Sequence, residues 1–174
     1  MHASAEMPYF IKPSRRLTTT EKHAAYAEAT AAIRATLGDE RDEQVKMVTI
    51  NCLLKTYLPY YYWVGFYLTR GEDRLVVGPY QGTLGCLYIE FGRGVCGAVA
   101  ASCETKIVDD THALEQGKEH IACDPNSRSE IVLPVVRADG SLLGVFDVDS
   151  TLKGSFDEVD RVALESLMKN VFGK

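Results

Sequence analysis

Two pairs of strand-like segments, each joined by a short polar turn, dominate the pattern of this sequence. The first pair, YYYWVGFYL from Tyr60 and RLVVGPYQG, surrounds the turn RGED. The second pair, SEIVLPVVR and SLLGVFDVDS, surrounds the turn ADG. Runs of β-branched and aromatic residues on either side of a polar turn are typical of β-hairpins. The chain must therefore fold around a sheet that contains two antiparallel hairpins.

Helices are predicted before these strands. Thr18 and Glu21 have capping-box spacing at the start of the first helix, and Gly38 is placed to end it with a left-handed cap. A second helix is predicted from about Asp39 to Thr56. Its predicted buried stripe consists of Val45, Val48 and Cys52.

The rest of the chain supplies shorter elements and a closing helix. We predict a short helix from Gly94 to about Ser102, a brief strand at TKIVD and a long polar loop over residues 109–128. Ser155 and Glu158 have the spacing that opens a final helix. Helices and antiparallel strands that are segregated along the chain in this way predict an α+β fold.

The size and charge of the chain limit what it can be. Its 174 residues fit one domain, which we place at residues 18–174 after an extended arm at residues 1–17. No apolar run reaches the roughly 20 residues that span a bilayer. A net charge of -5 without a Lys/Arg cluster disfavours nucleic acid as a partner. Because the N-terminus lacks the apolar core of a secretory signal, we expect a cytoplasmic protein.

Strand alternation gathers acidic and aromatic side chains on one face of the predicted sheet. Alternate residues of a strand share a face, so Asp147 and Asp149 lie opposite the apolar residues of their strand. The same parity takes Trp63 and Tyr67, and also Glu130, away from the core. A solvated outer face would show the same pattern. If these side chains share a pocket, they would hold a small molecule with an ammonium group and an apolar tail.

The chain has five cysteines without framework spacing, so we expect thiols that are free or catalytic. Cys123 lies in the long polar loop, three residues after His120, where exposure and an imidazole favour a thiolate. Cys96 falls in the first turn of the short helix, where the helix dipole favours a thiolate, and Cys86 follows a glycine-rich loop. From the residues alone, a spectator thiol at Cys123 and a small core residue at Cys96 remain alternatives.

A metal site has less support in the sequence. His112, His120 and Cys123 lie close together, but no CxxC pair accompanies them, and HxxC spacing often occurs by chance. The segment FGRGVCG also lacks the strand-GxGxxG-helix layout of a nucleotide-binding loop. We expect neither a metal nor an organic cofactor.

Six segments, taken together, resemble the free methionine-(R)-sulfoxide reductase family. They are, in order, WVGFYL, LVVGPYQGTLGC, IEFGRGVCG, HIACDPNSRSEIVLPV, GVFDVDS and SFDEVD, and the similarity covers about residues 20–172. The resemblance implies a single GAF domain, a six-stranded antiparallel sheet with helices packed on it, that commonly forms a homodimer. It implies reduction of the R epimer of free methionine sulfoxide, but not of the same residue within proteins.

The resemblance also implies roles for three cysteines. Cys123 is implied as the nucleophile that attacks the sulfoxide sulfur and becomes a sulfenic acid. Cys96 is implied as the residue that resolves this intermediate through a disulfide, and Cys86 as a third redox cysteine. Thioredoxin would then restore the dithiol.

The pocket residues are implied in the same way. Trp63 and Tyr67 match the aromatic wall of the family's pocket, and Glu130, Asp147 and Asp149 match the acids that hold the substrate. One acid must stay neutral in order to protonate the sulfoxide oxygen, and mutual repulsion among clustered acids allows this. An ammonium group among carboxylates makes charge-assisted hydrogen bonds that a peptide nitrogen cannot make. Which acid donates the proton is left open.

Two other classes of function fit parts of the pattern. GAF domains more often bind small molecules as sensing modules, but a sensor is generally fused to an effector, whereas this sequence ends two residues after its last predicted helix. A redox sensor whose Cys86, Cys96 and Cys123 exchange disulfides is the third class. Three cysteines at the redox positions favour the enzyme.

Overall fold

Four α-helices and six β-strands make up the part of the chain that the computed structural model describes, which is residues 12–114 and 124–174. The helices are α1 (Thr19–Leu37), α2 (Glu43–Tyr57), α3 (Gly94–Ser102) and α4 (Glu158–Phe172), with a 3-10 turn, η1, at Thr111–Ala113. The strands are β1 (Trp63–Arg70), β2 (Arg74–Gln81), β3 (Tyr88–Glu90), β4 (Lys106–Val108), β5 (Ser129–Val136) and β6 (Leu142–Ser150). None of these helices is long and apolar enough to cross a membrane.

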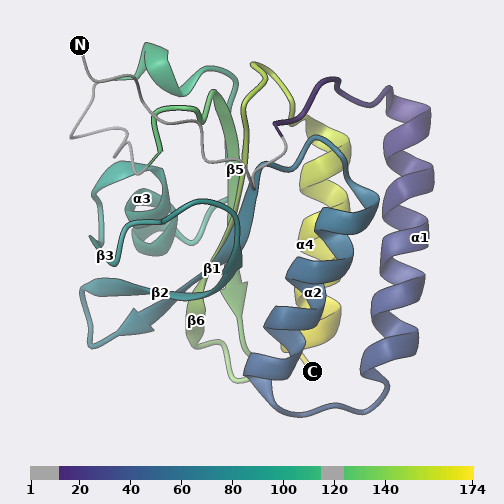
Figure 1. Ribbon diagram of the computed structural model, residues 1–174. Coiled ribbons are helices and arrows are strands. Elements are labelled where there is room, and N and C mark those ends of the chain that lie inside the picture. Colours follow the sequence, from purple (N-terminus) through teal and green to yellow (C-terminus); the bar gives the residue numbers. More distant parts are fainter. Residues whose placement is uncertain (1–11, 115–123) are drawn as a thin grey trace.

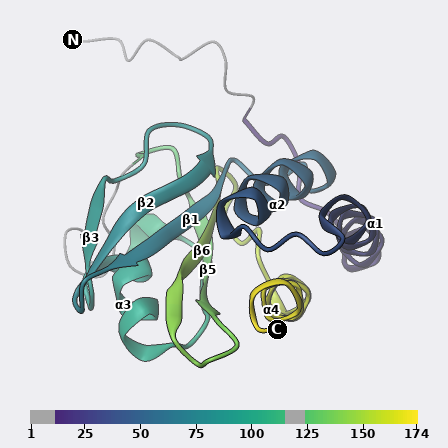
Figure 2. The ribbon, with the colours of Figure 1, turned by 90° about the horizontal axis from the view of Figure 1, so that it is seen from below.

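The strands form one sheet in the order β3-β2-β1-β6-β5-β4, and every neighbouring pair is antiparallel. The predicted hairpins are β1–β2 and β5–β6, and they meet through the β1–β6 pair at the centre of the sheet. The helices α1, α2 and α4 cover one face, and α3 lies on the other (Figures 1 and 2). The predicted α+β class and six-stranded antiparallel sheet are thus confirmed. Strand β3 has no counterpart among the strands predicted from the sequence, because three residues are too few to show alternation.

Each face of the sheet has its own hydrophobic core. Between the sheet and α1, α2 and α4, the first core takes Val64 and Phe66 from β1. On the side of α3, the second core takes Trp63 and Tyr67 from the same strand. Alternate residues of β1 therefore point into different cores, as strand geometry requires. The second core lies beside the polar residues of the predicted site.

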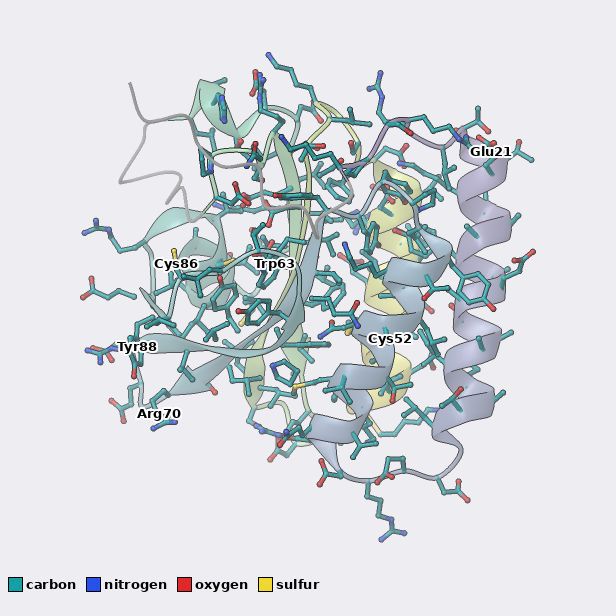
Figure 3. All side chains as sticks on the ribbon, in the orientation of Figure 1. Glu21, Cys52, Trp63, Arg70, Cys86 and Tyr88 are labelled. Carbon is teal, nitrogen blue, oxygen red and sulfur yellow. The ribbon has the colours of Figure 1, made fainter. Side chains whose placement is uncertain are left out.

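The buried face of α2 differs from the prediction. Val45 and Val48 are 42% and 45% exposed, and Cys52 on the same helix is exposed too (Figure 3). The buried apolar residues of this helix are instead Met47, Ile50 and Leu54. Both sets recur at helical spacing, but the second has longer side chains and so buries more apolar area against α1 and the sheet. Packing therefore decides between two apolar stripes on one helix.

The start of α1 is as predicted, whereas the start of α4 is not. Thr18 Oγ1 accepts a hydrogen bond from Glu21 N at 3.3 Å, and Glu21 Oε2 accepts one from Thr18 N at 2.8 Å. The prediction that Ser155 caps α4 is wrong, because Asp157 occupies the cap position and accepts from the backbone of the first turn. A carboxylate is favoured there since it also meets the positive end of the helix dipole.

Candidate active site

The register of three strands builds one polar row across the sheet. Trp63 on β1 pairs with Asp149 on β6, and Asp149 pairs in turn with Glu130 on β5. Two residues further along β1, Gly65 pairs with Asp147. Directly paired residues point to the same face of a sheet, so the acids and the indole ring stand together. The predicted parity of these side chains is confirmed.

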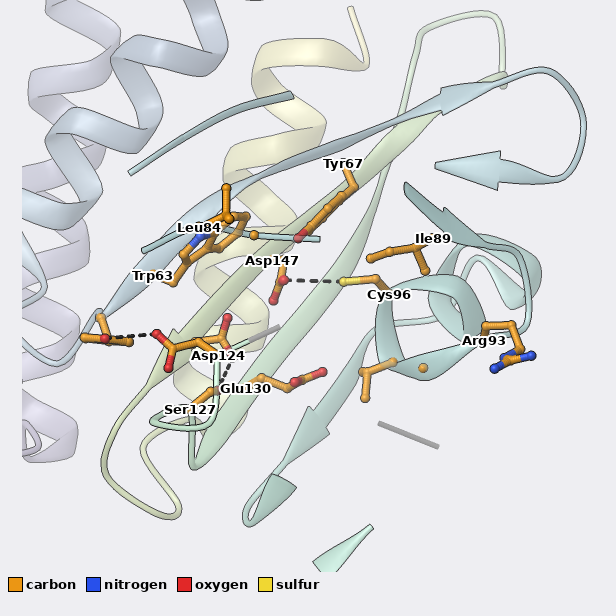
Figure 4. A pocket seen from close by; sticks show the side chains of 15 residues that line it. Trp63, Tyr67, Leu84, Ile89, Arg93, Cys96, Asp124, Ser127, Glu130 and Asp147 are labelled. Carbon is orange, nitrogen blue, oxygen red and sulfur yellow. Dashed lines mark hydrogen bonds between the residues drawn. The ribbon is translucent and has the colours of Figure 1, made fainter. Parts of the chain in front are cut away.

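A pocket opens on this face between the sheet and α3. The residues that sequence analysis assigned to substrate binding all line it: Trp63, Tyr67, Glu130, Asp147 and Asp149. Cys96 from α3 faces Asp147 across the pocket, as Figure 4 shows. The fold therefore brings six of the eight predicted site residues to one cavity.

Stacked aromatic rings form one wall of the pocket. The ring of Trp63 stacks on Tyr67 at a centroid distance of 5.6 Å and on Tyr80 at 5.2 Å. The loop after β2 lies directly on this stack, since a Cβ at Gly82 would lie 2.5 Å from Trp63 Cδ1 and one at Gly85 would lie 2.8 Å from the Tyr67 hydroxyl. Glycines at these positions allow the loop to close over the wall. The wall is flat and apolar, which suits a thioether-like chain.

The carboxyl group of Asp147 has an unusual environment. The residue is 7% exposed, its Oδ2 accepts a hydrogen bond from Cys96 Sγ at 3.4 Å, and its Oδ1 has no partner within the described residues. Burial, together with the charges of Asp149 and Glu130, raises the pKa of Asp147 well above its usual value. These surroundings disfavour the ionised form of Asp147, and its buried Oδ1 has no hydrogen-bond partner among the described residues.

The three candidate redox cysteines have different surroundings. Cys96 is a buried free thiol in the first turn of α3. Burial and the charges of Asp147 and Glu130 raise its pKa, which opposes the thiolate that the helix position favours; Cys96 packs in the second core, as the alternative of a small core residue expected. Cys86, on the α3 side of the sheet in Figure 3, is half-buried and disulfide-bonded. Cys123 lies outside the described residues.

Sequence analysis missed several pocket residues. Tyr62 directly precedes β1, and its hydroxyl donates to Asp124 Oδ2 at 3.0 Å. Ser127 donates through Oγ to Asp149 Oδ1, which fixes one acid of the row. The run of three tyrosines gave no signal that separates Tyr62 from Tyr61, whose ring packs in the helix-side core instead. The DPNS sequence after Cys123 did carry a signal, because Asp and Asn at this spacing favour a tight turn.

The metal hypothesis gains no support from the described residues. They contain no group of three or more His, Cys, Asp or Glu residues that could hold a metal ion. His112 Nε2 lies 3.2 Å from the Pro125 carbonyl oxygen, which accounts for one polar atom of its ring. His120 lies outside the described residues, as does Cys123.

The chain matches known proteins over most of its length. The GAF domain family matches residues 60–171. The free methionine-R-sulfoxide reductase of Escherichia coli (strain K12) is 38% identical over 143 residues, which are 82% of this chain and 84% of that protein. This chain belongs to the free methionine-R-sulfoxide reductase family. The yeast reductase of the same name, from Saccharomyces cerevisiae, shares 46% identity over 62% of this reductase and 59% of its own length.

A solved structure agrees with the fold of this reductase. The free methionine-R-sulfoxide reductase from Neisseria meningitidis, determined in complex with its substrate, aligns with a TM-score of 0.79 and 39% identity. The alignment covers 89% of this chain and 90% of that chain. The chain is therefore an oxidoreductase, and its fold is that of a GAF domain.

Proposed function

We propose that this reductase converts free L-methionine-(R)-sulfoxide to methionine and that thioredoxin supplies the electrons. The observation that carries the proposal is the buried acid of Asp147, whose pKa is raised and whose Oδ1 has no partner among the described residues, beside a stacked aromatic wall. Relatives named free methionine-R-sulfoxide reductases support the choice of substrate. No metal or organic cofactor takes part in the steps below.

The substrate is proposed to lie along the polar row. Its ammonium group binds Glu130 and Asp149, which are paired directly across β5 and β6. Its methyl and methylene groups lie on Trp63 and Tyr67. A residue within a protein has no free ammonium group, so it cannot make the charge-assisted hydrogen bonds to these two carboxylates and would bind poorly.

Asp147 is proposed as the acid that protonates the sulfoxide oxygen. A sulfoxide becomes a good electrophile only when its oxygen carries a proton. Burial, with the charges of Asp149 and Glu130, raises the pKa of Asp147 well above its usual value, which suits a group that must donate a proton. Its Oδ1, which has no partner in the described parts of the chain, can make the required hydrogen bond.

Cys123 is proposed as the nucleophile. Its thiolate attacks the sulfoxide sulfur and forms an S–S bond, while Asp147 protonates the oxygen, which takes up a second proton from solvent and leaves as water. A water molecule then attacks Cys123 Sγ, the S–S bond breaks, methionine leaves with the bonding electron pair, and Cys123 becomes a sulfenic acid as one proton is released. A second thiol displaces this oxygen as water and forms a disulfide, so methionine sulfoxide is reduced and two thiols are oxidised. The dithiol of thioredoxin reduces that disulfide.

Cys86 is proposed as the second thiol. Cys86 is disulfide-bonded, whereas Cys52, Cys96 and Cys103 are free, so Cys86 is the described cysteine that already takes part in a disulfide. The resemblance assigned this step to Cys96, whose raised pKa makes it a slow attacking thiol. Cys96 is retained as a third redox cysteine that exchanges with the first disulfide.

A coupled assay tests the proposed function. Purified protein with thioredoxin, thioredoxin reductase and NADPH is expected to consume NADPH when given free L-methionine-(R)-sulfoxide. The S epimer and an N-acetylated R sulfoxide, which lacks the ammonium group, serve as matched controls and should give little turnover. Absence of turnover with the free R epimer would contradict the proposed function. Equal turnover with the R epimer, the S epimer and the N-acetylated sulfoxide would contradict the assigned ammonium site.

Asp147→Asn is expected to lower the rate of methionine formation by about 10²–10⁴-fold, since it removes the proton donor. The same substitution is expected to raise, rather than lower, the free energy of unfolding. Because the folded-state pKa is raised, the folded chain binds more protons than the unfolded chain from about pH 4 up to the folded pKa. Wild-type stability therefore falls as pH rises through that window, and asparagine, which does not titrate, removes this loss.

Single-turnover rates and thermal melts between pH 5 and pH 8 measure both effects. Glu130→Gln is the matched control, because it neutralises another acid of the same row without removing the proposed donor. A variant at Asp147 that forms methionine at the wild-type rate would contradict its role as the acid. A melt that shows Asp147→Asn to be strongly destabilised would point to a structural role instead.

The cellular location, the oligomeric state and the domain bounds of the protein are also proposed. We propose a cytoplasmic location, in keeping with the free thiols of Cys52, Cys96 and Cys103. We also propose a homodimer, and a single domain at residues 18–174 preceded by an arm at residues 1–17.

A further inference from the structure

A hydrogen bond joins the two segments that carry the proposed disulfide. Thr83, three residues before Cys86, donates through Oγ1 to Asp124 Oδ2 at 2.6 Å. Asp124 directly follows Cys123 in the sequence. The contact spans 41 positions of the chain and links the loop after β2 to the turn before β5 through side chains. The proposed chemistry uses neither residue.

Asp124 is held firmly enough to act as an anchor. Its Oδ1 accepts hydrogen bonds from both the backbone and the side chain of Asn126, each at 2.8 Å, and its Oδ2 also accepts from the Tyr62 hydroxyl. Partial burial opposes ionisation, but these bonds and the one from Thr83 outweigh it and lower the pKa of Asp124. The group is a carboxylate at neutral pH, which makes each of its hydrogen bonds stronger.

The loop that carries Thr83 and Cys86 is also held in place by hydrogen bonds. The Thr83 carbonyl oxygen accepts from Trp63 Nε1 at 3.0 Å, and the Cys86 backbone hydrogen-bonds to the Tyr67 hydroxyl. Both partners belong to β1, so the loop that carries Cys86 is tied to the rigid centre of the sheet. The Thr83–Asp124 bond then holds Asp124, the residue next to Cys123, in place relative to this loop.

We propose that the Thr83–Asp124 hydrogen bond is a latch that positions Cys86 and Cys123 for disulfide formation. The inference rests on the proposed function. In the step concerned, the Cys86 thiolate attacks the sulfenic sulfur of Cys123, the S–S bond forms, and the sulfenic oxygen leaves as water after it takes up protons. Holding two reacting groups together raises their effective concentration. The latch thereby shortens the lifetime of the sulfenic acid, which would otherwise oxidise further.

Thr83→Val and Thr83→Ser form a matched pair that tests the latch. Valine has nearly the shape of threonine without the hydroxyl, whereas serine keeps the hydroxyl, and neither changes the charge near Cys123. Thr83 does not line the described pocket. In a single turnover with reduced enzyme, Thr83→Val is expected to form methionine at the wild-type rate. Disulfide formation should be about tenfold slower, because a hydrogen bond to a charged group is lost, and Thr83→Ser should restore it.

Quenched samples provide the readouts. Methionine is quantified, free thiols are counted, and the Cys123 sulfenic acid is trapped with dimedone and detected by mass spectrometry. More trapped sulfenic acid in Thr83→Val than in Thr83→Ser supports the latch. Disulfide formation within about twofold of wild type in Thr83→Val, or equal slowing in both variants, would overturn it. Failure of the wild type to form methionine would instead refute the proposed function.

Asp124→Asn supplies an independent check if Thr83→Val folds poorly. The substitution should slow disulfide formation when threonine is present at position 83. It should add little when valine is present, because the shared hydrogen bond is already gone. Fully additive effects in this double-mutant cycle would contradict the latch, even if each single variant is slow.

Discussion

Cys123→Ser is expected to abolish methionine formation, with a loss of at least about 10³-fold even in a single turnover. A serine hydroxyl is not ionised near neutral pH and cannot accept the oxygen as a sulfenic acid. The loss must therefore precede any disulfide step. Methionine released per subunit by the reduced variant, without thioredoxin, is the decisive measurement.

Other cysteine variants serve as controls for Cys123. Cys103→Ser removes an exposed free thiol and should keep full activity. Cys86→Ser should release one methionine per subunit and then stop, leaving a sulfenic acid on Cys123. Cys96→Ser should still form the first disulfide if Cys86 pairs first. A Cys123→Ser variant that releases one methionine would remove that residue from the nucleophile's role, and a Cys96→Ser variant without the first disulfide would reverse the proposed order.

Asp160→Ala is expected to lower the free energy of unfolding by about 3–5 kcal/mol. Asp160 is fully buried on α4, and its Oδ2 lies 2.5 Å from the Nζ of Lys22 on α1, which is 2% exposed. Its Oδ1 accepts hydrogen bonds from the hydroxyls of Tyr26, at 2.7 Å, and of Tyr60. Removal of the carboxylate leaves a buried ammonium group and two buried hydroxyls without their common acceptor.

Thermal and urea unfolding measure this loss. For a chain of this size, the expected fall in the melting midpoint is about 6–20 °C. Glu158→Ala is the matched control on the same helix, because it removes an exposed carboxylate paired with Arg161 and should change stability little. The double variant Lys22→Met, Asp160→Leu should regain much of the loss, since it leaves no buried charge without its partner; Asp157, which also pairs with Lys22, is exposed to solvent. A melt of Asp160→Ala equal to that of Glu158→Ala would show that the network contributes little.

The main elements of the fold could be predicted because their signals are local. Alternation along β1 follows from strand geometry alone, and it separated Trp63 and Tyr67 from Val64 and Phe66 before any tertiary contact was known. The cap of α1 at Thr18 is a contact over three residues. The wrong predictions arose where two local solutions were nearly equal, as for the apolar stripes of α2 and the start of α4.

The candidate site could be predicted in part. Strand parity placed Glu130, Asp147 and Asp149 on the polar side, and the family resemblance named them as site residues. Parity says nothing about register, however, and a shift of a single residue between β1 and β6 would move Asp149 away from Trp63. The roles of Tyr62 and Ser127 could not be predicted, because each depends on a partner far away in the sequence.

The sequence by itself determined the sheet-forming segments, the alternation of their faces and the chemical groups available for thiol chemistry. These features depend on the covalent chain and on the period of its backbone. Only the tertiary structure decided that the pKa of Asp147 is raised, that Cys96 is a buried thiol and that Thr83 contacts Asp124. Burial from water and distances between remote segments govern those properties, and both exist only after the strands have paired.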